Sequence, residues 1–387
     1  MVTVALVNLI PDPERHAPGA LADLRILDFS RVLAGPFATM MLADLGATVV
    51  KVERPGTGDE TRAWGPPYDE RGEATYFQSV NRNKDSVVLN LGDEEDLRRA
   101  RAMAAEADVV VENFRPGVMD RLGLGYGALS AADPALVYCS ITGFGRGEGA
   151  ALPGYDLLVQ ALGGLMSITG SPEGEPQKVG VALVDVLAGL FSTVGILAAL
   201  RHRAATGEGQ RVEVDLLSAL LAALVNQGSA FTLAGVVPGR MGNAHPSIAP
   251  YELYRTAAGD LVLAVGNDRQ FAALCEVLGE PELAEDPRYA SNTARVAHRE
   301  ELRGSLEALL VRAPARDWSR RLTEARVPAG VVNDIRGAFE LAQSLGMEPV
   351  VEIGRENGSV ARLTRNPVRL SKTPARYRSA PPRLPDR

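Results

Sequence analysis

The amino-acid sequence predicts an α/β protein with a larger Rossmann-like domain and a smaller α+β domain. Short, almost continuous runs of apolar and often β-branched residues alternate with helical patterns in the first half of the chain, which is typical of parallel strands covered by helices on both faces. A segment rich in proline and glycine, at 236–250, interrupts this pattern. The 387 residues also exceed the roughly 250–300 residues that a single core normally holds.

The predicted parallel strands share this apolar, β-branched composition. In chain order they are 24–29, 48–53, 86–91, 108–113, 136–144 and 211–217. Helices are predicted from Pro36, from Asp93 to Ala107, from Tyr155 to Thr169, from Val184 to Thr206 and after the last strand. The turn after the first strand reads SRVLAGPFA and lacks the GxGxxG sequence of dinucleotide-binding proteins. A nicotinamide-dependent dehydrogenase is therefore disfavoured.

Changes of pattern divide the chain into four segments. We expect an N-terminal extension at 1–20, the first part of the large domain at 21–235, a small α+β domain with its linkers at 236–326, and a return to the large domain with a C-terminal tail at 327–387. In the small domain, YELYRTAAGDLVLAVG predicts two strands around a Gly-Asp turn, followed by helices near 268–279, 292–312 and 315–326. Further on, VVEIGRENGSVARL predicts a hairpin. The basic, proline-rich end is expected to lie along the surface or fray.

Composition and cysteine usage exclude several classes of function. The chain has 48 acidic and 41 basic side chains, which argues against a nucleic-acid partner but not against a local cationic pocket for one phosphorylated ligand. Cys139 and Cys275 lie in apolar stretches without metal-ligand spacing, and the four histidines are scattered. We therefore expect no metal site and two reduced, packed thiols in a cytoplasmic protein.

A membrane location is also not expected from the apolar segments. The longest of them, from Val179 to Leu200, is interrupted by Asp185 and by three glycines, which favours a buried core helix over a membrane span. The N-terminus has no charged region before its apolar residues and soon reaches proline and acid. No signal peptide is expected there.

Asp185 is the most unusual residue by pattern, because it is a lone carboxylate at the start of an otherwise apolar helix. One interpretation is a helix N-cap that satisfies free amide groups without any catalysis. The other is a nucleophile or general base that the helix N-terminus keeps ionised and that apolar neighbours shield from water. The pattern alone leaves both interpretations open.

Three clusters of basic residues lie beside predicted strands. They contain Lys51, Arg54 and Arg62, then Arg82 and Lys84, and finally the basic residues of ENFRPG with Arg121. Open α/β sheets bind ligands at the carboxyl ends of their strands, so this repetition favours an anionic ligand, although each residue alone is more typical of a solvated loop. His245, in GNAHPSIAP, is a candidate substrate contact at a loop tip, or simply an exposed loop histidine.

A series of sequence blocks carries a family resemblance. They are DFSRVLAGPFATMMLADLGATVVKVERPGTGDETRAWGPP, YFQSVNRNK, ADVVVENFRPG, GLGYGAL, YCSITGFG, GYDLLVQALGGLMSITG and ALVDVLAGLFSTVGILAAL. In this order they resemble the class III CoA-transferases across about residues 22–375. Two further blocks, GNAHPSIAPYELYRTAAGDLVLAVGNDRQF and NTARVAHREEL, are most similar to the branch that uses succinyl-CoA and dicarboxylic acids such as glutarate or hydroxymethylglutarate.

The resemblance implies an interlocked homodimer, with a large domain built from both chain ends and a small domain from the middle. It implies transfer of CoA from a donor such as succinyl-CoA to a small dicarboxylic acid of the glutarate, hydroxymethylglutarate, malate or citramalate kind. Asp185 matches the nucleophile, which forms an aspartyl anhydride and then an aspartyl-CoA thioester. CoA thioesters are substrates, and no permanently bound cofactor is implied.

The resemblance also assigns binding residues. Those expected to contact CoA are Val32, Leu33, Arg54, Leu89, Asn113, Arg121, Leu122 and Tyr155. Of these, Arg54 and Arg121 suit phosphates, while Leu89 and Leu122 can flank the adenine. The distal carboxylate of a dicarboxylic acid is expected to meet a loop with Gly242, Asn243, His245 and Ser247, or alternatively Arg31.

Two alternative functions remain beside this one. The related α-methylacyl-CoA racemases resemble GHD where this chain has Gly154, Tyr155 and Asp156, and racemisation needs a second acid/base opposite the carboxylate. The missing histidine counts against a racemase or epimerase. A non-catalytic acyl-CoA-binding protein is the other alternative, but such a protein has little use for a carboxylate at Asp185.

Overall fold

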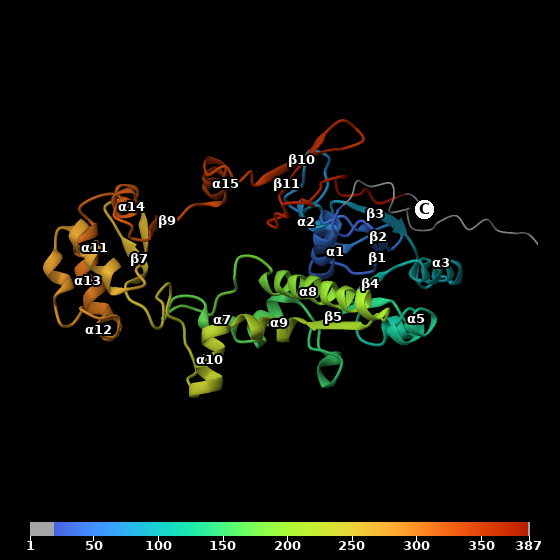
Figure 1. The fold of residues 1–387 in the computed structure, drawn as a ribbon, viewed down its shortest axis with the longest axis horizontal. Coiled ribbons are helices and arrows are strands. Elements are labelled where there is room, and N and C mark those ends of the chain that lie inside the picture. The colour runs from blue at the N-terminus through green and yellow to red at the C-terminus, as the bar shows by residue number, and fades with distance from the viewer. Residues whose placement is uncertain (1–18, 386–387) are drawn as a thin grey trace, which may run out of the picture. The chain divides into compact units, whose positions relative to one another are not determined.

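The computed structural model describes residues 19–385 and divides into two compact units (Figure 1). The first unit contains Val179–Val236 and the described parts of Met1–Leu165 and Glu348–Arg387, and the second contains Met166–Lys178 and Val237–Met347. The predicted N-terminal extension at 1–20 lies almost entirely outside the described residues.

A six-stranded sheet forms the centre of the first unit. Its strands are β1 (Arg25–Asp28), β2 (Thr48–Glu53), β3 (Lys84–Val88), β4 (Val109–Glu112), β5 (Val137–Thr142) and β6 (Arg211–Asp215). Their order is β3-β2-β1-β4-β5-β6, and every neighbouring pair is parallel, which confirms the predicted parallel sheet. The order reverses between β1 and β4, so a ligand crevice is expected at the carboxyl ends of these two strands.

Helices cover both faces of this sheet. On one face, α1 (Ala34–Asp44) and α8 (Leu183–Thr206) share a core with Ile26 and Val111. On the other, α3 (Glu94–Ala105) and α5 (Tyr126–Ala132) share a core with Leu27 and Val110. Neighbouring strand residues thus enter different cores, which explains why the strands are almost continuously apolar.

The apolar helix α8 packs into the first unit along one side. By length and hydropathy it is long enough to cross a membrane, as are α9 (Leu216–Ala223) and α10 (Val225–Ala234) taken together across an 84° bend. However, α8 contacts α1, β5 and β6, and Val184, Ala188 and Ile196 are buried. A Cβ at Gly189 would lie 2.7 Å from the Ala34 carbonyl oxygen. This close contact is typical of a core helix.

Smaller elements complete the first unit. They are η2 (Glu60–Ala63), α2 (Thr75–Ser79), α4 (Val118–Arg121), η3 (Glu148–Ala151), α6 (Asp156–Leu162) and the predicted hairpin, β10 (Val350–Gly354) with β11 (Val360–Thr364). The short helix α7 (Leu165–Ile168) begins at the end of the unit's first segment. Near the C-terminus, the Arg378 N–H donates to Asn83 Oδ1 at 2.6 Å, and its guanidinium donates to the Ala47 carbonyl at 2.8 Å. This part of the tail lies along the first unit and does not fray.

The second unit has an antiparallel sheet of β7 (Tyr251–Arg255), β8 (Asp260–Ala264) and β9 (Ala329–Val331). Its helices are α11 (Asp268–Leu278), η4 (Pro281–Ala284), α12 (Asn292–Ala297), α13 (Arg299–Leu310), α14 (Ala315–Glu324) and α15 (Ile335–Ser344). The chain re-enters the first unit at Glu348 and not at residue 327, where the sequence predicted the return. The reason is that β9 pairs with β8, where Leu261 lies opposite Val331.

Candidate active site

An open pocket lies beside the carboxyl ends of β1, β4 and β5 in the first unit. It holds about 1130 Å³ of empty space, its open mouth included. Its lining comes from the segments 31–34, 113–116, 141–145 and 152–156, together with Glu60, Trp64, Gly149, Ala150, Asp185 and Leu216. The pocket therefore lies in the crevice that the strand order predicts.

Asp185 is the third residue of α8, inside the helix and not at its N-cap. The N-cap residue is Ala182, whose side chain makes no capping hydrogen bond. The N-cap interpretation of Asp185 is therefore wrong. Among the described residues, nothing donates a hydrogen bond to the half-buried Asp185 carboxylate or pairs with it as a cation. An accessible carboxylate in a pocket is suited to act as a nucleophile.

Asp156 caps α8 from a neighbouring helix. It lies in the first turn of α6, and its Oδ1 accepts the N–H groups of Val184 at 2.8 Å and Asp185 at 3.3 Å. Its Oδ2 accepts from Gln160 Nε2 at 2.6 Å. The loop after β5 approaches this segment closely, because a Cβ at Gly143 would lie 2.4 Å from the Gly154 Cα. Asp156 therefore ties α6, α8 and the pocket wall together.

The electrostatic state of Asp185 differs from the expectation. Burial, and then the negative charge of Asp156, raise the pKa of Asp185 to about 7. In the nucleophile interpretation the helix N-terminus keeps this carboxylate ionised, but Asp156 takes the free amide groups at that terminus. With this pKa, Asp185 changes charge near neutral pH.

The loop after β1 supplies a cation to the pocket. The Arg31 guanidinium pairs with Glu60 at 2.9 Å and lies 4.7 Å from the centre of the Phe114 ring. The Arg31 N–H donates to Asn113 Oδ1 at 2.9 Å, and Asn113 Nδ2 donates back to the Arg31 carbonyl at 2.7 Å. This reciprocal bonding joins the loops after β1 and β4, with Arg31 at their junction.

The predicted site residues divide into two groups in the first unit. Those that line the pocket together are Arg31, Val32, Leu33, Asn113, Tyr155 and Asp185. Within the described chain, Arg54, Leu89, Arg121 and Leu122 do not belong to its lining. Arg54 lies close by, since it pairs with Glu60 at 3.5 Å, whereas the Leu89 side chain is buried in the core beside α3 and is not available to flank an adenine. Arg121 is exposed at the end of α4, and Leu122 follows it.

The predicted substrate loop belongs to the second unit and is ordered by its own hydrogen bonds. Gly242 has a φ of 61°, in the region that favours glycine, and its N–H donates to the Gly170 carbonyl at 3.0 Å. The Ser247 N–H donates to His245 Nδ1 at 3.1 Å, and the His245 ring contacts Tyr251. Asn243 is exposed on this loop.

Several basic residues that suggested an anionic ligand are instead internal ion-pair partners. Lys51 pairs with Asp59 at 2.9 Å, Lys84 with Asp28 at 3.1 Å, Arg62 with Glu53 at 2.7 Å and Arg82 with Asp44 at 2.6 Å. Burial lowers the pKa of Lys84 to about 8. For these four residues, the expectation of an anionic ligand is therefore wrong.

The sequence did not single out four other residues of the pocket. Glu60, Trp64 and Phe114 line it and lie in sequence blocks that resemble the family, but the sequence analysis assigned them no role, and Asp156 was noted only as part of the GYD segment. That segment was the available signal for Asp156, because it places a second carboxylate at a helix start. No histidine belongs to the described pocket lining, which gives the racemase alternative no support.

Residues 19–385 contain neither a candidate metal site nor an exposed thiol. No group of three histidine, cysteine, aspartate or glutamate side chains there has the geometry to hold a metal ion. Cys139 and Cys275 are free and buried, as predicted, and burial raises the pKa of each thiol to about 12. Neither cysteine belongs to the described pocket lining.

The fold and the pocket define an α/β enzyme with a carboxylate at a helix start in the sheet crevice. The chain belongs to CoA-transferase family III, which it matches over residues 21–386. It is 44% identical to a succinate–glutarate CoA-transferase of Agrobacterium fabrum, over 96% of this chain and 94% of the relative. It is 41% identical to an acetyl-CoA:oxalate CoA-transferase of Acetobacter aceti, over 91% and 90%.

Solved structures agree with this assignment. A CaiB/BaiF family protein from Brucella suis has 42% identity and a TM-score of 0.83, covering 93% of this chain and 95% of that one. A Mycobacterium tuberculosis protein, solved in an orthorhombic form, has 31% identity and a TM-score of 0.86, covering 95% and 98%. The two-unit chain described above thus has the fold of this family.

Proposed function

We propose that the protein transfers CoA from succinyl-CoA, or a similar donor, to a small dicarboxylic acid. Relatives with 39–44% identity are named for succinyl-CoA or succinate with glutarate, and others for mesaconate and citramalate. The observation that carries the proposal is the free Asp185 carboxylate in a pocket that also presents the Arg31 guanidinium. A nucleophile and a carboxylate-binding cation are the two groups that this reaction needs.

The proposed reaction proceeds through covalent intermediates on Asp185. Its carboxylate attacks the thioester carbonyl of the donor, the C–S bond breaks, and an aspartyl anhydride and CoA thiolate result. The thiolate then attacks the aspartyl carbonyl, which releases the donor acid and leaves an aspartyl-CoA thioester. The acceptor carboxylate attacks this thioester to form a second anhydride, and the thiolate finally takes the acceptor acyl group. Asp185 is regenerated, and no water enters the balance.

We assign contacts with the CoA donor to residues in and beside the pocket. Val32, Leu33, Asn113 and Tyr155 form the wall on which we place the CoA chain. Arg54 and Arg121 are the exposed cations that we assign to its phosphates. Gly242, Asn243, His245 and Ser247 remain candidates for the distal carboxylate, as does Arg31.

We also propose an interlocked homodimer in the cytoplasm, without a nucleic-acid or membrane partner. Large apolar side chains are exposed on α8 and α10, among them Leu190, Phe191, Val194, Phe231 and Leu233. A second copy of the chain would remove these faces from water. The free thiols support a reducing compartment.

A panel of acceptor acids assayed with succinyl-CoA tests the function. We expect glutarate and other dicarboxylates to react at least about tenfold faster than monocarboxylates of equal length, since one charge-assisted hydrogen bond discriminates by roughly that factor. Arg31→Gln is expected to reduce this preference. Transfer at equal rates to all acids would contradict the dicarboxylate assignment, and no transfer at all would contradict the function.

Asp156→Asn is expected to move the acidic limb of the pH profile to lower pH. A nucleophilic carboxylate acts in its ionised form, so activity rises as the pH passes the Asp185 pKa of about 7. Removing the Asp156 charge lowers that pKa, while an asparagine oxygen still accepts the Val184 N–H. The measurement is kcat/KM for succinyl-CoA against pH, with Asp93→Asn, at the N-cap of α3, as the control. A limb that stays in place or moves to higher pH would refute the coupling.

A further inference from the structure

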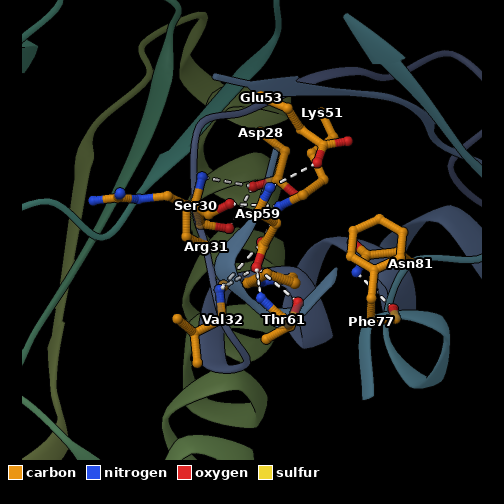
Figure 2. Close-up of polar contacts among 12 residues, drawn as sticks. Asp28, Ser30, Arg31, Val32, Lys51, Glu53, Asp59, Thr61, Phe77 and Asn81 are labelled. Carbon is orange, nitrogen blue, oxygen red and sulfur yellow. Dashed lines mark hydrogen bonds and ion pairs between the residues drawn. The ribbon is translucent and has the colours of Figure 1, made fainter. Parts of the chain in front are cut away.

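The loop after β1 is fixed by side chains from three other segments. The Ser30 carbonyl accepts from Lys51 Nζ at 2.7 Å, and the Val32 N–H donates to the Asp59 carboxylate at 3.2 and 3.4 Å. Between them, both backbone polar groups of Arg31 are bonded to the Asn113 side chain. Side chains therefore hold the backbone on both sides of Arg31, as Figure 2 shows for Ser30, Val32 and Asp59.

Lys51 and Asp59 are themselves a fully buried ion pair. Their charged atoms are 2.9 Å apart, and neither side chain is exposed to solvent. Asp59 also accepts from the Thr61 N–H at 2.9 Å and the Thr61 hydroxyl at 2.7 Å. Although burial alone would raise it, the Lys51 ammonium holds the pKa of Asp59 below its usual value. Neither residue belongs to the described pocket lining, so the pair lies behind the wall.

The conformation that this pair holds is an unfavourable one. Val32 has a φ of 70°, which is costly for a β-branched residue and persists only where the surroundings impose it. In this conformation the Arg31 side chain points away from Asp59 (Figure 2) and lines the pocket. Leu33 becomes the N-cap of α1. The shape of the pocket at residues 31–33 thus depends on contacts with Lys51 and Asp59, which do not themselves line the pocket.

We propose that Lys51 and Asp59 are positioning residues that keep residues 31–33 in the conformation that binds the acyl-CoA donor. The inference rests on the proposed function for the identity of that donor. Without the pair, Val32 relaxes to an ordinary φ. The donor then binds only the fraction of molecules in which residues 31–33 have the binding conformation. We expect the effect to fall mainly on donor binding, because Asp185 lies on another element, α8, and Asp156 caps the start of that helix independently of the pair.

Asp59→Asn in the full chain tests the proposal against a matched substitution, Asp44→Asn. Asparagine keeps the shape and one acceptor but removes the charge that holds Lys51. Asp44 is equally buried in an ion pair, with Arg82, and does not line the pocket. We expect Asp59→Asn to raise KM for succinyl-CoA about tenfold with kcat changed less than about twofold. Asp44→Asn should leave KM within about twofold of the wild-type value, even if it lowers the melting temperature as much as Asp59→Asn does.

Hydrogen exchange supplies a second readout that does not depend on activity. In Asp59→Asn the amides of 29–37 are expected to exchange at least about tenfold faster, while those of β5 do not change. If the wild-type chain has no transferase activity, the proposed function is refuted. Hydrogen exchange at 29–37 then still tests whether Lys51 and Asp59 hold this segment in place. If Asp59→Asn does not fold, Lys51→Met with Asp59→Asn removes both buried charges, and the same readouts apply. The proposal is overturned if KM and exchange at 29–37 stay within about twofold of wild type, or if Asp44→Asn changes them equally.

Discussion

Asp185→Asn is expected to abolish CoA transfer, with a fall in kcat/KM on the order of 10⁴. The carboxamide has the size of the carboxylate but cannot form the anhydride, so the thioester must exchange without covalent help. The wild-type chain, incubated with succinyl-CoA and then with hydroxylamine or borohydride, is expected to be modified only on the peptide that contains Asp185. Mass spectrometry of the digested protein and a succinyl-CoA consumption assay provide the two measurements.

The matched control is Asp93→Asn, since Asp93 also lies at the start of a helix. Its carboxylate caps α3 through the N–H groups of Glu95 and Asp96, and asparagine caps about as well. This variant should therefore transfer CoA at the wild-type rate. The covalent mechanism is wrong if Asp185→Asn keeps more than about a tenth of the activity or if the label appears on another peptide.

The first unit could be predicted well from sequence because its signals are local. The strands β2, β4 and β5 are short apolar runs that both helix layers cover, so their composition identifies them without knowledge of their partners. The helix α3 begins where Asp93 caps it and acidic residues fill its first turn. These features depend on residues that are close together in the chain.

The boundary of the second unit depends on contacts between distant residues. The strand β9 has only three half-buried residues, Ala329–Val331, and is a strand because β8 lies beside it. Its composition resembles that of the strands in the first unit, so the pattern suggested a return to the large domain. Strand pairing of this kind follows from the tertiary structure and not from propensity.

For the site, the sequence could identify Asp185 but not the charges that surround it. A single acid in an apolar helix is visible in a sequence, whereas the capping of α8 by Asp156 requires α6 to lie beside it. Likewise, Lys51 and Lys84 look like free cations until Asp59 and Asp28 are placed against them. A charged residue reveals its role only when its partner is known, and these partners are remote in the chain.

Lys84→Met is expected to lower the free energy of unfolding by about 3–5 kcal/mol, because it leaves a buried carboxylate without its nearest cation. Neither Lys84 nor Asp28 is exposed, and Lys84 Nζ also donates to the Pro36 carbonyl at 2.9 Å and to Asn81 Oδ1 at 3.0 Å. Chemical denaturation of each variant measures the loss. The exposed pair of Arg98 with Glu95 provides the comparison, since Arg98→Met should cost less than about 1 kcal/mol.

The double variant, Asp28→Asn with Lys84→Met, shows which part of this loss is due to the unpaired charge. Removing both charges avoids the desolvation that an isolated Asp28 would suffer, so the double variant should be more stable than Lys84→Met alone. The Ser30 hydroxyl donates to Oδ1 of Asp28 and the Thr39 hydroxyl to Oδ2, so the single oxygen of an asparagine keeps one of these two acceptors. If the double variant is less stable than Lys84→Met, the pair stabilises the fold through its hydrogen bonds, and the mutual compensation of two buried charges is not its main contribution.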